Sequence, residues 1–127
     1  MPFTLSARSR SRLAGVHPHL QRVVELAIRR APIDFMVTEG LRTVERQREL
    51  FKAGATQTMN SRHITGHAVD LAAIVGGKVR WDWPLYARIA GAMKSAAAEL
   101  GVPLEWGGDW KSFKDGPHFQ LPKRLYP

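Results

Sequence analysis

The stretch Ser61-Arg62-His63-Ile64-Thr65-Gly66-His67-Ala68-Val69-Asp70 decides how the rest of this chain has to fold. His63 and Asp70 are seven positions apart, a spacing that does not place them on one face of a helix. A turn at Gly66 followed by a strand over 67–74 fits the pattern better, with Asp70 on one face of that strand. The stretch therefore predicts half of a site, an imidazole and a carboxylate, which a distant segment must complete.

The second half of the predicted site is the segment Asp115-Gly116-Pro117-His118. The chain has no Cys, so metal ligands are restricted to His and carboxylate side chains. A catalytic zinc ion takes three protein ligands, and His63, Asp70 and His118 are the candidates for these positions. Asp115 would then lie beside the metal, as general base toward a water molecule and general acid toward the leaving amine.

The other histidines favour ordinary structural roles. His17 and His19 fall at the start of a predicted helix, where we interpret them as exposed or capping side chains. His67 lies four positions after His63, but Gly66 between them makes a helical pairing unfavourable. We therefore interpret His67 as a neighbour of the site rather than a ligand.

The composition is that of one folded domain. The 127 residues reach a common domain size, and a hydrophobic fraction of 44% with four Trp is typical of a packed globule. No segment approaches the roughly 18 consecutive apolar residues that span a bilayer. The N-terminal segment lacks the apolar region of a secretory signal. We therefore expect a single catalytic domain over residues 1–127, without a signal peptide.

The chain is strongly basic, with 19 Lys and Arg against 11 Asp and Glu and a net charge of +8. This balance favours polyanionic partners, namely nucleic acid, anionic lipid or an acidic cell-wall polymer, and charge alone does not choose among them. The densest basic cluster is Arg8, Arg10 and Arg12, which we interpret as a solvated basic end of the chain.

Periodicity predicts helices and strands mixed along the chain without a regular alternation. Apolar spacing and capping signals predict helices over 4–14, 18–30, 44–53 and 84–100, the first of them short. Shorter apolar runs predict strands over 35–38, 67–74, 78–80, 104–106 and 118–121. Residues 55–62 are polar and lack periodicity, which predicts a loop at the mouth of a site. The fold class is therefore α+β, with a small mainly antiparallel sheet packed against about three main helices.

Four motifs in this order resemble one superfamily of zinc peptidases. Residues 61–70 meet its pattern Ser-x-His-x-x-Gly-x-Ala-x-Asp, and residues 115–119 meet the pattern of an acidic residue two positions before Pro-His-Phe. Between them, Glu105-Trp106-Gly107-Gly108-Asp109-Trp110 looks like a tryptophan-glycine stretch, and Gly40-Leu41-Arg42-Thr43 with Gln47 looks like the segment whose arginine faces the substrate. Over about residues 35–121 the chain resembles the zinc D-Ala-D-Ala carboxypeptidase and dipeptidase superfamily, most strongly its phage and bacterial L-alanyl-D-glutamate peptidoglycan endopeptidases of endolysin type.

The resemblance implies a Hedgehog/DD-peptidase-like fold and one Zn²⁺ per chain, bound by His63, Asp70 and His118. It implies that Asp115 is the catalytic base and that Arg42 stabilises the carbonyl oxygen as it becomes an oxyanion, or holds a substrate carboxylate. The remaining residues that we expect to bind substrate or support the site are Ser61, Gln47, Trp106 and Asp109.

The activity implied by the resemblance is hydrolysis of the L-Ala–D-Glu bond in peptidoglycan stem peptides, which lyses the cell wall. One alternative is a D,D-carboxypeptidase or dipeptidase acting on D-Ala-D-Ala ends, although the dipeptidases of this superfamily carry Glu where this chain has Asp115. Another is a non-catalytic basic binding module, but the Trp residues fall within 81–83 and 106–110 rather than along one basic surface.

The resemblance also implies where the enzyme acts and with what it associates. Peptidoglycan is the expected partner, and the basic surface would attract the enzyme to anionic envelope polymers. We expect no obligate nucleic acid and no transmembrane segment. We expect a monomer that is made in the host cytoplasm and acts on the cell wall in the periplasm, after release through a phage-encoded pore.

Overall fold

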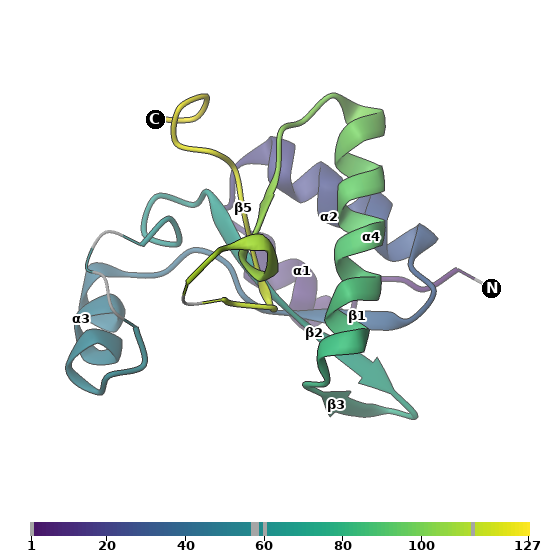
Figure 1. Ribbon diagram of the computed structural model, residues 1–127, viewed down its shortest axis with the longest axis horizontal. Coiled ribbons are helices and arrows are strands. Elements are labelled where there is room, and N and C mark those ends of the chain that lie inside the picture. The colour runs from purple at the N-terminus through teal and green to yellow at the C-terminus, as the bar shows by residue number, and fades with distance from the viewer. Residues whose placement is uncertain (1, 57–58, 60, 113) are drawn as a thin grey trace.

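A computed structural model describes residues 2–56, 59, 61–112 and 114–127 (Figure 1). Its helices are α1 (Ala7–Leu13), α2 (Pro18–Arg30), α3 (Val44–Lys52) and α4 (Trp83–Leu100), with a short 3₁₀ turn η1 (Gly107–Asp109). Its strands are β1 (Asp34–Glu39), β2 (Ala68–Val75), β3 (Lys78–Arg80), β4 (Glu105–Trp106) and β5 (His118–Gln120). The predicted α+β class is confirmed.

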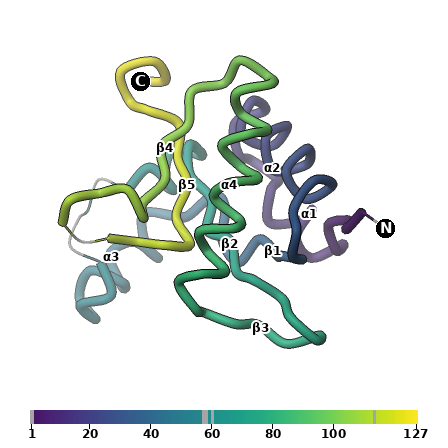
Figure 2. Tube along the Cα trace, turned by 45° about the vertical axis from the view of Figure 1, so that its right-hand side comes forward, coloured from purple at the N-terminus to yellow at the C-terminus, as the bar shows by residue number. Residues whose placement is uncertain are grey.

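The strands form one five-stranded sheet in the order β1-β2-β5-β4, and β3 pairs with the end of β2. Every pairing among the described strands is antiparallel, as predicted. β5 comes from the C-terminal part of the chain and lies beside β4 (Figure 2). Its other edge is hydrogen-bonded to β2, so the sheet lays the His118 segment directly along the Asp70 segment.

Three of the four helices in the described residues build the hydrophobic core with the sheet. α2 packs against α4, and α1 packs against β1. α3 stands apart from these helices, at the other end of the molecule (Figure 1), and Gln47 is its only buried residue among those described. The sequence predicted the helix over 44–53 as one of three main helices and the one over 4–14 as a short one, whereas the structure places α1 in the core and α3 outside it. None of the helices in the described part of the chain is long and apolar enough to span a membrane.

The second helix follows its sequence signals closely. α2 begins at Pro18, and the side chain of His17 caps it by accepting a hydrogen bond from the His19 N–H at 3.0 Å. The interpretation of His17 as a capping residue is thus confirmed. Burying each large apolar side chain of this helix contributes about 1.5–3 kcal/mol. The large side chains that are buried are Leu20, Val23, Val24 and Ile28, and Ala27 is buried beside them.

The basic N-terminal segment is only partly a solvated end. Arg8 and Arg10 are exposed, as expected. Arg12 is partly buried, and its Nη1 donates a hydrogen bond to the Val37 carbonyl oxygen at 3.0 Å. One of the three arginines therefore joins α1 to β1 and does not simply lie in solvent.

Alternation along β2 separates the core from the opposite face of the sheet. Val69 and Leu71 pack into the core, together with Phe119 of β5. Asp70 lies between them in sequence and so points to the other face, because successive side chains of a strand alternate. In the β2–β5 register Asp70 lies directly opposite His118. The sheet therefore presents both residues on the face away from the core.

Candidate functional site

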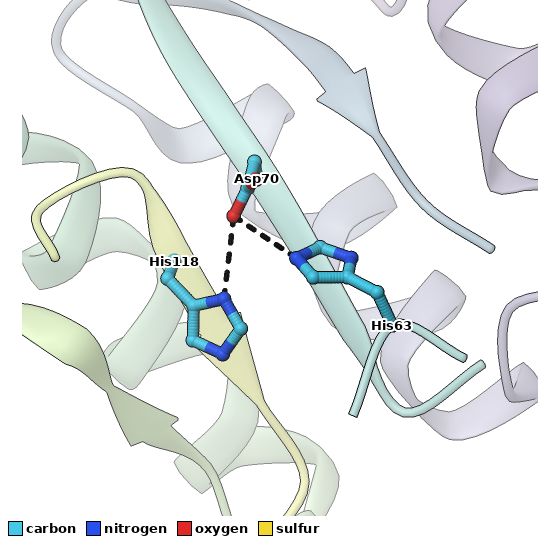
Figure 3. A group of neighbouring side chains, drawn as sticks. All are labelled: His63, Asp70 and His118. Atoms are coloured by element: carbon cyan, nitrogen blue, oxygen red, sulfur yellow. Dashed lines mark hydrogen bonds and ion pairs between the residues drawn. The ribbon is translucent and has the colours of Figure 1, made fainter. Parts of the chain in front are cut away.

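His63, Asp70 and His118 face one another in the structure (Figure 3). One ligand atom from each residue lies within 4.8 Å of the others. His63 Nε2 and His118 Nδ1 are 3.2 Å and 3.3 Å from the same atom, Oδ1 of Asp70. The two histidines are only 2% and 7% exposed. The fold thus brings together the two halves that the sequence suggested.

Each of these three residues is positioned by the local structure around it. Asp70 and His118 come from paired strands, whereas His63 comes from the turn before β2. Gly66 makes that turn possible, because its φ is +78° and a Cβ there would lie 2.6 Å from the Gly15 carbonyl oxygen. Only glycine combines the left-handed conformation with so close an approach. The predicted turn at Gly66 is confirmed.

Hydrogen bonds behind the two imidazoles determine what the site can hold. His63 Nδ1 donates to the Gly40 carbonyl oxygen at 2.9 Å, and His118 Nε2 donates to Gln120 Oε1 at 2.8 Å. Gln120 Nε2 in turn donates to Glu105 at 2.8 Å, which explains why the amide oxygen is the atom that faces His118. A neutral imidazole that donates through one nitrogen has a lone pair on the other.

Three electron-pair donors therefore converge on one point. In the neutral histidines the remaining lone pairs face the carboxylate of Asp70 at 3.2 Å and 3.3 Å, which is repulsive unless positive charge lies between them. Two imidazole nitrogens and a carboxylate oxygen are a donor set typical of catalytic zinc. A hydrogen-bond acceptor behind each imidazole is also usual for metal-bound histidine. The cluster is therefore compatible with a metal site.

The electrostatics of the cluster favour a cation at its centre. Burial opposes the ionisation of Asp70, but hydrogen bonds from His118 and His63 outweigh it and hold the pKa of Asp70 far below its ordinary value. Burial also lowers the pKa of His118, yet its hydrogen bond to Asp70 and the charge of that carboxylate raise the pKa above its ordinary value overall. Protons and a metal ion therefore compete for the same atoms.

Arg42 is fixed beside the cluster by two side chains. Its Nε and Nη2 donate to the two carboxylate oxygens of Glu39 at 2.6 Å and 2.5 Å, and its Nη1 donates to Gln47 at 2.7 Å. The Arg42 side chain is 8% exposed, and its Nη2 lies 3.9 Å from Asp70 Oδ2. Gln47 thus supports the site by holding Arg42, whereas Glu39 was not among the residues that the sequence suggested.

A β-bulge brings Glu39 to the site. On a regular strand Glu39 would share the core face with Phe35 and Val37. The register of β1 against β2 shifts after Val37, so that Val37 pairs with Leu71 but Glu39 pairs with Asp70. The extra residue turns Glu39 toward the face that carries Asp70. Alternation after Phe35 and Val37 predicts an apolar side chain at position 39. The charged Glu39 at that position is the one sequence signal that indicates the bulge.

Asp115 lies in the segment between η1 and β5. Its N–H donates to the Gly107 carbonyl oxygen at 3.1 Å, and a Cβ on Gly107 would lie 2.3 Å from the Asp115 carbonyl oxygen. Glycine at 107 is therefore needed for the two backbones to meet. Partial burial and the negative charge of Asp70 raise the pKa of Asp115, although His118 opposes this. A carboxylate with a raised pKa is suited to exchange protons with a reacting group.

A cavity of about 520 Å³ opens in front of these residues. Its size is within the range of small-molecule sites. It is lined by Glu39, Arg42, Leu50, Ala55, Thr56, Ser61, Arg62, His63, Asp70, Trp110, Asp115, His118, Gln120 and Lys123. The loop predicted at the mouth of a site over 55–62 thus contributes to the lining, while Gln57, Thr58 and Asn60 lie outside the described residues.

Comparison with known proteins identifies the family. The family described as phage L-alanyl-D-glutamate peptidase matches residues 1–121 of the chain. The chain belongs to this family. The L-alanyl-D-glutamate peptidase of Escherichia phage T5 is 34% identical over 119 residues, which cover 91% of this chain and 87% of that protein. The crystal structure of the L-Ala D-Glu endopeptidase ChiX of Serratia marcescens is 56% identical with a TM-score of 0.91, and the match covers 95% of this chain and 91% of that one.

The L-alanyl-D-glutamate peptidase fold extends to a more distant structure. The vancomycin resistance D,D-dipeptidase VanXYg is 20% identical with a TM-score of 0.55, over 84% of this chain and 50% of that one. At this identity the likeness concerns the fold alone. The resemblance to L-alanyl-D-glutamate endopeptidases that the motifs suggested is confirmed.

In this L-alanyl-D-glutamate peptidase, the tryptophan-glycine stretch divides between the cavity and its surroundings. Trp106 lies outside the cavity lining, and its Nε1 donates to the Gly116 carbonyl oxygen at 2.8 Å. Asp109 forms an exposed ion pair with Lys94 at 2.6 Å, and it is not in the cavity lining. Trp110, which the sequence did not single out, lines the cavity instead. Trp106 and Asp109 therefore contact the structure around the cavity, whereas Trp110 forms part of the cavity wall.

Ser61 and His67, from the stretch over residues 61–70, differ in whether they line the cavity. Ser61 lines the cavity, and its Oγ accepts a hydrogen bond from the His63 N–H at 3.2 Å, which supports the turn. His67 is absent from the lining, and its Nδ1 is 2.7 Å from Thr65 Oγ1. The ring of His67 lies 5.7 Å from that of His17, on the helix α2 side of the turn. Its placement agrees with the interpretation of His67 as a neighbour of the site.

Proposed function

We propose that this protein is a zinc-dependent endopeptidase that hydrolyses the L-Ala–D-Glu bond of peptidoglycan stem peptides. The observation that carries the proposal is the convergence of His63, Asp70 and His118 in the lining of a cavity that also includes Asp115. The activity named for the phage T5 protein and for ChiX supports the choice of bond. Two imidazoles and one carboxylate are a donor set that catalytic zinc uses, with the fourth position left for water or substrate.

The chain's own residues would divide the chemistry between them. The metal ion, when bound, supplies Lewis acidity that polarises the scissile carbonyl and lowers the pKa of a water molecule. Asp115 accepts a proton from the attacking water and delivers it to the amine of D-Glu as the C–N bond breaks. The raised pKa of Asp115 favours the first transfer, because a less acidic carboxyl group is a stronger base toward the water molecule.

Arg42 supplies fixed positive charge at the same wall of the cavity. Glu39 and Gln47 accept from three nitrogen atoms of its guanidinium, which leaves N–H groups free on both Nη atoms. These groups would donate to the carbonyl oxygen as negative charge develops, or to a carboxylate of the substrate. Because Glu39 already holds the guanidinium in place, little reorganisation is needed when that charge appears.

Digestion of purified peptidoglycan by the zinc-loaded enzyme tests the proposal. Mass spectrometry of the products should find new N-terminal D-Glu together with new C-terminal L-Ala. Release of terminal D-Ala would instead establish a D,D-carboxypeptidase. Peptidoglycan that stays intact, while zinc is shown to be bound, would refute a hydrolytic function on this substrate.

We also propose that the enzyme works as a monomer on the cell wall, after release from the cytoplasm through a pore of phage type. Its net charge of +8 supports attraction to anionic envelope polymers. Sedimentation with wall fragments should therefore weaken as salt is added, because salt screens exposed charges. Light scattering after size exclusion should give the mass of one chain, and a larger mass would refute the monomer.

A further inference from the structure

A second cavity, of about 250 Å³, shares one lining residue with the larger cavity. It is lined by Trp81, Trp83, Tyr86, Lys114, Asp115, Gly116 and Pro117. Asp115 is the residue common to both linings. The smaller cavity therefore opens next to the proposed general base, and its other residues have no role in the proposed reaction.

Two large aromatic side chains stand exposed at this smaller cavity. Trp81 is 57% exposed and Trp83 is 50% exposed. Their rings lie 6.1 Å and 6.3 Å from the ring of Tyr86, so the three form a continuous aromatic group. Burial in the core does not explain the two tryptophans. A contiguous apolar patch with a polar rim at a cavity is typical of a surface that binds a ligand.

Tyr86 and Trp83 of the aromatic group pack against residues beneath them. Tyr86 is only 3% exposed, and the ring of Trp83 lies 6.5 Å from that of Trp106. Trp106 also holds the backbone of Gly116 through its 2.8 Å hydrogen bond. A Cβ added to Gly116 would lie 3.2 Å from the Tyr86 ring and 3.3 Å from the Trp83 ring, so the backbone packs closely on both. A preformed surface of this kind loses little entropy when it binds a ligand.

The two cavities differ in the charge of their linings. Arg42, Arg62 and Lys123 line the larger cavity, which suits the carboxylates of a stem peptide. Lys114 is the one cation among the described residues that line the smaller cavity. Aromatic rings dominate that lining, so it suits an uncharged ligand that has an apolar face and hydrogen-bonding groups at its edge.

We propose that the smaller cavity binds the N-acetylmuramyl sugar ring of the glycan strand to which the stem peptide is attached. This inference rests on the proposed cleavage of the L-Ala–D-Glu bond. In that substrate L-Ala is joined directly to the lactyl group of the sugar, so the ring lies about two residue lengths, roughly 7 Å, from the scissile bond. Asp115 must act at the scissile bond, and the cavity that borders Asp115 is within this reach.

The chemistry of an N-acetylated pyranose matches the lining of the smaller cavity. One face of the ring presents C–H groups, which pack on the electron-rich faces of Trp81 and Trp83. Lys114 is exposed at the same cavity and can donate to a hydroxyl or acetamido oxygen. The charged peptide then occupies the larger cavity and the neutral sugar occupies the smaller one, with the scissile bond between them at Asp115.

A pair of substrates that differ in the sugar tests the inference. These are N-acetyl-L-Ala-γ-D-Glu-L-Lys and N-acetylmuramyl-L-Ala-γ-D-Glu-L-Lys. We expect the zinc-loaded wild type to prefer the muramyl substrate in kcat/KM by about tenfold, the size of effect that one favourable apolar contact has on specificity. Trp81→Ala and Trp83→Ala should each bring the ratio toward one. Phe51→Ala removes an aromatic ring that is 46% exposed and lines neither cavity, so it should keep the wild-type ratio.

Equal kcat/KM for the two substrates in the wild type would overturn the inference. So would an unchanged ratio in the Trp variants that keep the wild-type Tm; if Trp83→Ala lowers the Tm, Trp81→Ala decides alone.

If neither substrate is cleaved, the proposed function fails, and a binding measurement decides the inference separately. The indole N–H signals of the ¹⁵N-labelled wild type are followed by NMR during titration with a GlcNAc–MurNAc disaccharide whose lactyl group is capped as an amide. Shifts at Trp81 and Trp83 but not at Trp110, which lines the larger cavity, support the sugar site. Unshifted Trp81 and Trp83 signals overturn it.

Discussion

Replacing Glu39 by Gln should weaken both the fold and the site. Gln has the same length as Glu, but it carries no charge and turns one acceptor oxygen into an N–H donor. Arg42 donates to both oxygens of Glu39, at 2.6 Å and 2.5 Å. In Glu39→Gln one of these hydrogen bonds is lost, and the other loses the strength that an ionised acceptor provides.

The expected cost follows from the burial of the pair. The Arg42 side chain is 8% exposed and the Glu39 side chain is 30% exposed. Removing one partner of a fully buried pair costs about 3–5 kcal/mol. Solvent at Glu39 reduces this, so we expect a loss of about 2 kcal/mol in the free energy of unfolding. For a domain of this size such a loss lowers the Tm by about 7 °C.

The same variant should weaken metal binding. Without its ionised partner, the Arg42 guanidinium has Asp70 as its nearest carboxylate, already 3.9 Å away. If Arg42 moved closer to Asp70, it would form hydrogen bonds to the carboxylate that would otherwise bind the metal ion. Loss of an outer partner of a metal site typically lowers affinity by about 10–100-fold, and we expect the lower end of that range for zinc.

Urea unfolding of a double-mutant cycle measures the coupling. The cycle comprises the wild type, Glu39→Gln, Arg42→Met and the double variant, all in a metal chelator so that zinc does not add to the stability. A coupling near zero would refute the reasoning. Glu49→Gln is the matched control: Glu49 pairs with Arg46 at 3.2 Å, but both side chains are exposed, so the change should cost less than about 0.5 kcal/mol.

Changes at three more residues test the metal site and the base. His118→Ala should lose most of the zinc, which in the wild type should be about one ion per chain by elemental analysis; full retention would disprove its assignment as a ligand. Gln120→Leu removes the acceptor behind His118 and should weaken zinc affinity about 10–100-fold in a chelator competition. Asp115 must be ionised to accept a proton, so kcat/KM at saturating zinc should fall as the pH drops through the pKa of Asp115. In the zinc-free protein that pKa should lie above the ordinary Asp value of about 3.9, which an NMR titration of the carboxyl group measures. Asp115→Ala should keep the zinc and lose activity by about 100-fold or more, and unchanged turnover would place the base elsewhere.

Features that depend on one segment could be predicted from the sequence. α2 begins at Pro18 and ends at Arg30, as the proline and the apolar stripe indicate, because a helix is determined largely by residues within a few positions of one another. The strand through Asp70 is similar, since alternation along β2 alone decides that Asp70 points away from Val69 and Leu71. The three ligand candidates come from segments of this kind.

Features that depend on two segments could be predicted less well. Asp109 and Trp110 are neighbours in sequence, yet Asp109 pairs with Lys94 on α4 while Trp110 lines the cavity. Which of the two faces the ligand depends on how η1 lies against α4, and no local pattern contains that information. Gln120 is different, because two positions after His118 on one strand it must share the face of that histidine. That signal was present in the sequence.

The register of β2 against β5 determines whether the ligand candidates Asp70 and His118 meet at all. Asp70 faces His118 only while Val69 pairs with Phe119 one position earlier. A slip of one residue would turn one strand's entire set of side chains to the opposite face. Asp70 would then enter the core, where an unpaired carboxylate is costly, and buried apolar residues would leave it. Val69, Leu71 and Phe119 are fully buried on the core face of the sheet, which never touches substrate. Their packing therefore keeps the two halves of the site in place.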